Sequence, residues 1–170
     1  QYETLFNTAY DEVLLDKQEA NYEVESKNQI FSIEEISQVL KNKECNEDLL
    51  YMALDQLQQL NVRMIIPVIQ DYLMNPQNHF FAKTLLIEIM IDQQIDEDIQ
   101  VEKFGRYYDI NPSYMALVLE QTQYAETLKY LQNGIEDENP SLFEQCVEYL
   151  EYTLYALYPQ DIYEEDCHVL

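Results

Sequence analysis

The stretch HFFAKTLLIEIMIDQQ, residues 79 to 94, is the most apolar part of this 170-residue chain. Apolar side chains surround its helix axis almost completely, and only Thr84, Glu88 and Asp92 form a polar strip. A helix with this pattern is buried on several sides by other elements. The stretch therefore predicts a central helix on which the rest of the chain packs.

Start signals predict further helices on the N-terminal side. Residues 2 to about 26 carry apolar side chains at the spacing of one helix face. Ser32 followed by Glu35 is a capping-box signature, and Asn46 can cap the next helix. A helix at about 62 to 74 contains Pro67, which removes a backbone hydrogen bond and predicts a late start or a kink.

The stretch IQVEKFGRYYDINP, residues 99 to 112, departs from the helical pattern. Apolar and polar residues alternate through Ile99, Val101 and Phe104, which is typical of a strand. Gly105, one of only two glycines in the chain, separates this run from a second short run. Because glycine tolerates the positive φ of a tight turn, the stretch predicts a β-hairpin with Gly105 as its structural turn residue.

The hairpin needs a partner, because an isolated pair of strands is marginally stable in water. We expect Val101 and Ile110 to pack on the helix at 79 to 94 or on the C-terminal helices. The exposed edge of the hairpin can also pair with a second copy of the chain, which makes a homodimer one expected assembly.

Two helices are predicted after the hairpin. One covers about 114 to 134, with Gly134 as its C-terminal cap. The other begins with Asn139 as cap and Pro140 at its first position, and ends before Pro159.

These elements predict a mainly α fold of stacked antiparallel helical hairpins, TPR-like or HEAT-like, with one small β-hairpin near residues 99–110. An up-and-down bundle is the alternative. The chain begins at Gln1 rather than methionine, so a fragment of a longer protein is expected. The expected organisation is one helical domain over 1–170, with a helical stack at 1–95, the β-hairpin at 96–112, a helix pair at 113–158 and a tail at 159–170.

The charge balance excludes several classes of partner. Nine basic and 33 acidic residues give a net charge of −24, which repels nucleic-acid phosphates and anionic membrane surfaces. No apolar run reaches the roughly 20 residues that a membrane helix needs. The acidic surface has three interpretations: solvation, docking of a basic protein, or mimicry of nucleic acid. Three widely spaced cysteines favour a reducing, cytoplasmic environment.

The sequence shows no catalytic, cofactor-binding or metal-binding motif, so we predict none of these sites. His79 precedes a helix and is expected to cap it or pack there. Cys167 and His168 lack the second ligand pair that a structural zinc site requires, and they fit a flexible terminus. The stretch DEDIQVEK, residues 96 to 103, lacks the glycine and glutamate positions of a calcium loop. A metal-dependent hydrolase remains an alternative that rests only on the abundance of carboxylates.

Tyrosine is unusually frequent on the last predicted helix. These side chains can widen its buried face, or they can form a surface for a protein partner, since tyrosine is enriched at interfaces. The predicted partner surface consists of Tyr149, Tyr152, Tyr155 and Tyr158.

The segments HFFAKTLLIEIMIDQQ, VEKFG, ENPSLFEQ and LYP together resemble the C-terminal part of an uncharacterised bacterial family of TPR-repeat-containing proteins. The resemblance covers roughly residues 79 to 159. Family members are longer at the N-terminus and often carry a tryptophan near the C-terminal end, which EEDCHVL here lacks. The resemblance implies helical repeats and a protein-binding role, with no catalytic residues to transfer.

The sequence therefore favours a non-enzymatic, cytoplasmic module that binds a protein, with a basic partner as one option. The alternatives are an acidic decoy or nucleic-acid mimic that occupies a basic protein, and the hydrolase. Direct binding of nucleic acid or membrane is not expected.

Overall fold

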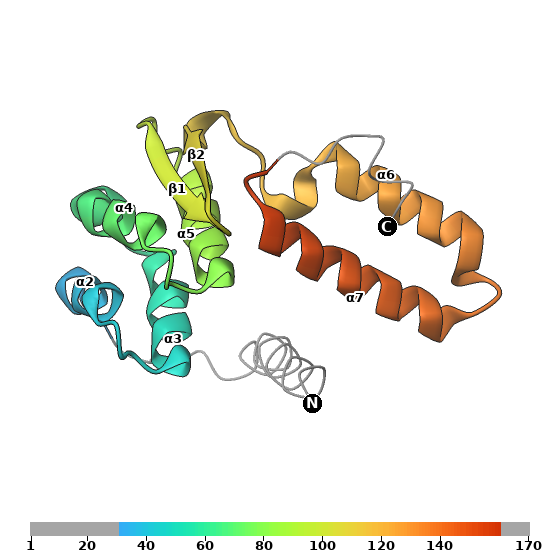
Figure 1. The fold of residues 1–170 in the computed structure, drawn as a ribbon, viewed down its shortest axis with the longest axis horizontal. Coiled ribbons are helices and arrows are strands. Elements are labelled where there is room, and N and C mark those ends of the chain that lie inside the picture. Colours follow the sequence, from blue (N-terminus) through green and yellow to red (C-terminus); the bar gives the residue numbers. More distant parts are fainter. Residues whose placement is uncertain (1–30, 161–170) are drawn as a thin grey trace. The chain divides into compact units, whose positions relative to one another are not determined.

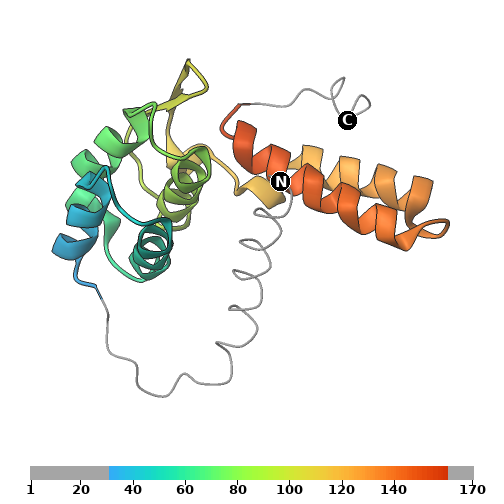
Figure 2. The same cartoon turned by 60° about the horizontal axis from the view of Figure 1, so that its bottom comes forward.

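The computed structural model describes residues 31 to 160, which form helices and one β-hairpin (Figures 1 and 2). The predicted mainly α fold with a small hairpin is confirmed. The helix predicted at residues 2 to about 26 and most of the predicted tail lie outside the described residues. The elements are α2 (Ile33–Lys41), α3 (Glu47–Leu57), α4 (Ile66–Met74), α5 (Phe80–Asp92), β1 (Ile99–Lys103), β2 (Arg106–Ile110), α6 (Thr122–Leu131) and α7 (Pro140–Leu157).

The helix starts follow the local signals in the sequence. The Ser32 hydroxyl accepts from the Glu35 N–H at 3.3 Å, and the Glu35 carboxylate accepts from the Ser32 N–H at 2.7 Å. Asn46 caps α3 through its side chain. A 3-10 turn precedes α4, which begins at Ile66, so Pro67 lies in the first helical turn where its missing N–H disrupts no bond. The predicted late start is confirmed.

The helices stack as hairpins. The helix pairs α2 with α3 and α4 with α5 each pack together, while α2 also packs on α4 and α3 on α5. The third pair, α6 with α7, contacts this stack where α7 packs on α5. Like elements of successive hairpins therefore lie against each other, as in helical-repeat proteins.

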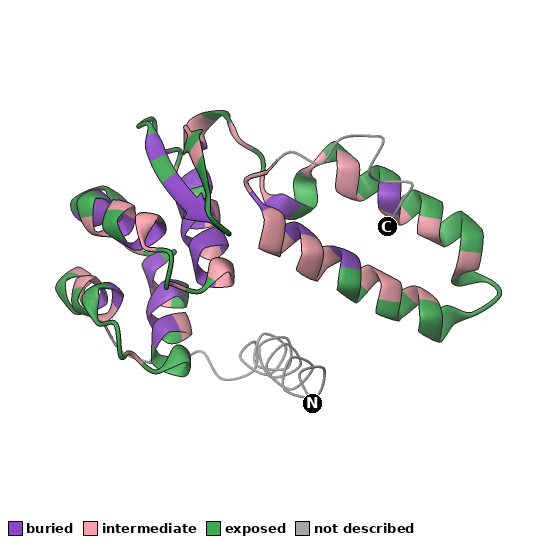
Figure 3. Ribbon diagram, viewed as in Figure 1, coloured by how far each residue is buried: buried purple, intermediate pink, exposed green. Residues whose placement is uncertain are grey.

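Helix α5 is the central element, as predicted. It packs on α3, α4, α7 and the turn at Pro112–Tyr114. In Figure 3 most of α5 is purple, which marks buried residues. The buried side chains are Ala82, Lys83, Thr84, Leu86, Ile87, Ile89, Met90 and Ile91.

The β-hairpin takes the place that a helix would occupy in a regular stack. In such an array the first helix of the third hairpin would cover α4, yet here β1 packs on α4 and α6 packs on α7. Val101 is fully buried and Ile110 packs on the core at half burial. The main helical neighbour of β1 is thus α4, rather than α5 or the C-terminal helices as expected from the sequence.

The hairpin closes through a two-residue turn. Lys103 pairs with Arg106, so Phe104 and Gly105 form the loop, with φ of 52° and 77°. Two positive φ values in succession define a type I′ turn, whose twist matches that of the strands. The expected positive φ of Gly105 is confirmed. Phe104, which we expected on the strand, is a turn residue and is 65% exposed.

The segment after the hairpin differs from the expected helix at 114 to 134. Two 3-10 turns, Pro112–Tyr114 and Val118–Glu120, precede α6, which begins at Thr122. In this segment the Val118 N–H donates to Glu88 of α5, and the Ala116 carbonyl accepts from Tyr158, which follows α7. Gly134 lies in a π-helical turn without a positive φ, so the prediction of a glycine C-cap was wrong.

Helix α7 has the predicted ends. Asn139 caps it, Pro140 occupies its first turn, and the helix stops before Pro159. Only Leu150 and Leu154 of α7 are buried, and α6 and α7 are mostly pink and green in Figure 3. The C-terminal pair is therefore much less covered than α5.

Replacing Gly105 with valine should lower the free energy of unfolding by about 1–2 kcal/mol, because a β-branched residue tolerates φ of +77° poorly. An added Cβ there would meet nothing within 4 Å, so the cost comes from backbone strain alone. Gly134→Ala is the matched control and should be neutral or stabilising by up to about 1 kcal/mol. Denaturant unfolding measures both, and equal effects at the two glycines would contradict the assigned turn.

Candidate interaction site

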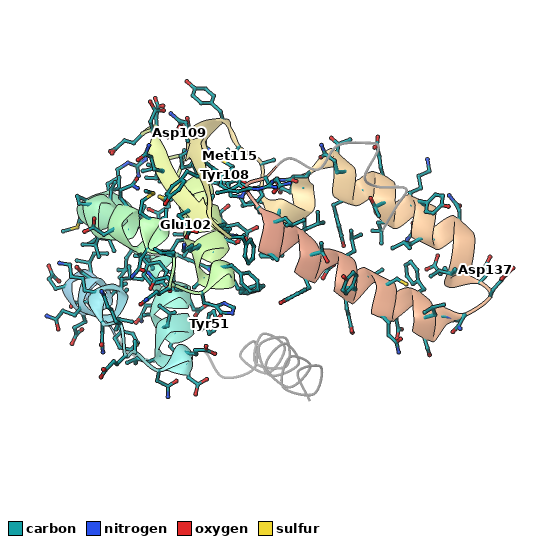
Figure 4. All side chains as sticks on the ribbon, in the orientation of Figure 1. Tyr51, Glu102, Tyr108, Asp109, Met115 and Asp137 are labelled. Carbon is teal, nitrogen blue, oxygen red and sulfur yellow. The ribbon has the colours of Figure 1, made fainter. Side chains whose placement is uncertain are left out.

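A buried polar cluster joins α5 to the hairpin. The Lys83 ammonium lies 2.9 Å from a Glu102 carboxylate oxygen, and the two side chains are only 2% and 4% exposed. Lys83 also donates to the Glu102 backbone carbonyl, while the other carboxylate oxygen accepts from the Gly105 N–H at 2.8 Å. Figure 4 labels Glu102 on β1, beside α5. Between residues 31 and 160 this is the only ion pair.

Lys103, the next residue of β1, extends the cluster to α7. Its ammonium donates to the Thr84 hydroxyl and to the carbonyls of Tyr155 at 3.1 Å and Ala156 at 3.3 Å. These carbonyls belong to the last turn of α7, where backbone acceptors lack helical partners and a cation is favourable. Lys103 therefore fastens the C-terminal end of α7 to the hairpin.

The protein environment lowers the pKa of both Lys103 and Glu102, which favours the neutral form of the lysine and the charged form of the carboxylate. Burial, together with the nearby Lys83 ammonium, lowers the pKa of Lys103 to about 7. The hydrogen bond from Lys83 lowers the pKa of Glu102, so this carboxylate stays ionised at neutral pH. An amine with such a pKa can serve as a base, but the Lys103 amine is buried and bonded to three oxygens. The cluster is therefore a structural connection.

A groove of about 330 Å³ lies beside the cluster, at the lower end of the size range of ligand pockets. One wall is a single face of α5, and the other is the chain around the 3-10 turn at Val118–Glu120; Tyr155 of α7 and Gln58 after α3 complete the lining. The lining contains three carboxylates and no basic side chain. The lining residues are Gln58, Leu85, Glu88, Ile89, Asp92, Leu117, Leu119, Glu120 and Tyr155.

Hydrogen bonds connect the two walls of the groove to each other and to the C-terminal end of α7. The Glu88 carboxylate accepts from the Val118 N–H at 3.1 Å and from the Tyr155 hydroxyl at 3.4 Å. The Tyr158 hydroxyl donates to the Ala116 carbonyl at 2.9 Å. The groove is consequently built into the fold, and the polar strip predicted on α5 faces it through Glu88 and Asp92.

The four tyrosines of the predicted partner surface lie in different environments. Tyr149 is 65% exposed, whereas Tyr158 is buried at 3%. The ring of Tyr152 meets Phe80 edge-on, and the ring of Tyr155 stacks on a neighbouring phenylalanine of α5. Only Tyr149 therefore presents most of its ring to solvent.

A shallow depression of about 170 Å³ lies between α6 and α7 beside Tyr149. Its lining is neutral and includes Leu131, Cys146 and Leu150. On the same face of α7, one turn or two away, lies Leu142, which is 43% exposed. We call Leu131, Leu142, Cys146 and Tyr149 the α6–α7 patch.

The other candidate residues have structural surroundings. His79 caps α5 by accepting from the Phe81 N–H at 3.3 Å and stacks on Phe80. Burial lowers its pKa. Cys167 and His168 lie outside the described residues. Within residues 31–160, no three His, Cys, Asp or Glu side chains gather as metal ligands, and no helix is both long and apolar enough to cross a membrane.

Sequence reasoning missed the two buried lysines and the groove. Lys83 could have been recognised from the sequence, because it is a charged residue in the most apolar helix and does not belong to the predicted polar strip. The groove offered no signal, since its walls come from segments distant in the chain.

Replacing Lys83 with methionine should destabilise the protein by about 3–5 kcal/mol, because it leaves the Glu102 carboxylate buried without a counter-ion. The double variant Lys83→Met/Glu102→Leu should be more stable than either single variant. Lys129→Met, at an exposed lysine of α6, is the control and should change stability by no more than about 0.5 kcal/mol. Additive losses in the double variant would contradict the pairing.

The stability of the protein should rise between pH 7 and pH 9. Folded Lys103 has a pKa near 7 and unfolded lysine about 10.4, so the unfolded chain binds about half a proton more at pH 7 and nearly one more at pH 9. Stability then increases by about 2 kcal/mol from pH 7 to pH 9, and it falls again as pH drops from 9 through 7. Denaturant unfolding at both pH values should show this increase for the wild type and for Lys129→Met, and lose it in Lys103→Met. An unchanged increase in Lys103→Met would disprove the assignment.

The chain has a distant relative among known proteins. No protein-family model matches the chain, and no solved structure matches it. The chain is similar to the TPR repeat-containing protein YsoA of Bacillus subtilis (strain 168), with 25% identity over 103 residues. The matched part is 61% of this chain and 31% of that protein, so the chain spans about a third of its relative. The expected resemblance to TPR-repeat-containing proteins is confirmed at this distance.

Proposed function

We propose that this chain is a non-enzymatic helical-repeat module that binds another protein through the α6–α7 patch. The observation that carries the proposal is the exposure of large apolar side chains on a helix pair with little burial of its own, above all Tyr149 and Leu142. Exposed aromatic side chains beside a depression are common anchor points of protein interfaces. The distant similarity to a protein described as TPR repeat-containing supports the same role.

The net charge of −24 supports a partner with a basic surface. Opposite charge accelerates association and excludes acidic competitors, and salt screens both effects. The affinity should therefore fall as ionic strength rises. The pairing of two copies through the edge of β2 stays a prediction, which size-exclusion chromatography with light scattering can test.

If the α6–α7 patch binds the partner, removing the Tyr149 side chain should weaken the binding. Tagged full-length protein should capture a protein from cell extract at low salt, and Tyr149→Ala should reduce that capture about tenfold or more. Glu144→Ala, at another exposed position of α7, is the control and should capture a similar amount. Both variants should keep the wild-type thermal midpoint, since both side chains are exposed.

Two results would count against this function. One is the absence of any captured protein at every salt concentration. The other is an equal loss in the Tyr149 and Glu144 variants, which would place the interaction elsewhere on α7 or attribute it to charge alone.

A further inference from the structure

We infer that the groove between α5 and the 3-10 turn at Val118–Glu120 binds a short protein segment in which basic and apolar side chains alternate. The inference rests on the proposed protein-binding function, and it adds a second surface and the chemistry of its ligand. It follows from the shape of the groove, from its apolar floor and from the negative charge of its rim.

The face of α5 in the groove repeats with the helical period. Leu85, Glu88, Ile89 and Asp92 occupy positions i, i+3, i+4 and i+7. These positions span about 10 Å along the helix, which is the length of about three extended residues. The other faces of α5 are covered by neighbouring elements, so this is the face through which the central helix can contact a ligand.

The floor and the rim differ in polarity. Leu85, Ile89 and Leu117 supply an apolar floor, while the exposed Asp92 and Glu120 carry carboxylates at the rim and the Glu88 carboxylate already bonds to the protein. Lysine and arginine match such a surface, because their methylene stems pack on apolar groups while the charged end reaches a carboxylate. Leucine or phenylalanine between them would fill the remaining floor.

The walls are already in place before a ligand binds. Glu88 bridges the two walls by accepting from the Val118 N–H, it connects α5 to α7 by accepting from the Tyr155 hydroxyl, and the Tyr158 hydroxyl holds the chain at Ala116. A preformed groove avoids the entropy cost of ordering its walls on association. A segment of only a few residues can therefore bind measurably.

Charge argues against the other occupants. A second copy of this chain carries the same −24 charge, and nucleic acid would bring phosphates to a carboxylate rim. Residues 1–30 of the chain itself contain seven acidic and two basic residues, so they also lack complementarity. A basic segment of another protein is the occupant with the matching sign.

The first arm of the test uses full-length protein and an array of seven-residue peptides built from lysine, arginine, leucine, phenylalanine, glutamate and serine in varied order. Bound peptides should combine basic and apolar residues, and peptides with only one of these classes should bind at least about tenfold more weakly. Retention of purely basic peptides to the same extent would show general attraction to an acidic protein and would overturn the inference. So would the absence of binding to any peptide.

The second arm assigns the site with matched variants. The pair Asp92→Asn/Glu120→Gln should weaken binding of the best peptide about tenfold or more, measured by fluorescence anisotropy. Glu144→Gln/Glu148→Gln removes the same charge from exposed positions of α7 and should change the affinity less than twofold. Leu119→Ser should weaken binding, while Met64→Ser, at another exposed apolar residue, should not. Equal effects of the groove and control variants would place binding outside the groove.

The third arm identifies the occupant and separates this inference from the proposed function. A photo-reactive benzoylphenylalanine at position 119 should crosslink to the bound peptide. Crosslinks from there to residues 1–30 or to a second copy would overturn the inference. If the captured partner protein crosslinks to a probe at position 149 and never to one at 119, the proposed function stands and the groove inference fails. If it crosslinks at neither position, both fail.

Discussion

Glu102 can remain ionised inside this protein because the Lys83 ammonium lies 2.9 Å away and neutralises it. A buried charge without such a partner is costly, so the pair couples the position of β1 to that of α5. The adjacent Lys103 then connects β1 to the last turn of α7. One short strand thus carries an ion pair to the central helix and a set of lysine hydrogen bonds to the end of α7.

This connection explains how a β-hairpin can replace a helix in a stack of helical hairpins. A regular repeat relies on the apolar face of the next helix to cover the previous one. Here β1 covers α4 with a shorter apolar surface, centred on Val101. The hydrogen bonds of Lys83 and Lys103 also connect the hairpin to α5 and to the end of α7 at specific atoms.

The replacement of a helix by the hairpin also affects which side chains are exposed. Because the hairpin packs on α4, the third helix pair contacts the stack mainly through α7, which packs on α5. Helix α6 consequently buries little, and apolar side chains such as Leu142 and Tyr149 stay exposed on the pair. The chain between the hairpin and α6 crosses α5 and leaves the acidic groove beside it. Both proposed binding surfaces are therefore consequences of one irregularity in the repeat.

The sequence by itself determined the elements that depend on neighbouring residues. Ser32, Asn46, Pro67, Gly105 and Asn139 act through backbone geometry and hydrogen bonds within a few residues, so their roles were predicted correctly. The apolar pattern of residues 79 to 94 likewise identified the central helix. Only the tertiary structure decided that Lys83 and Lys103 are buried, that the helix expected from residue 114 begins at Thr122, and that a groove lies beside α5. Those outcomes depend on partners distant in the chain, whose contacts have no local periodicity that a sequence can display.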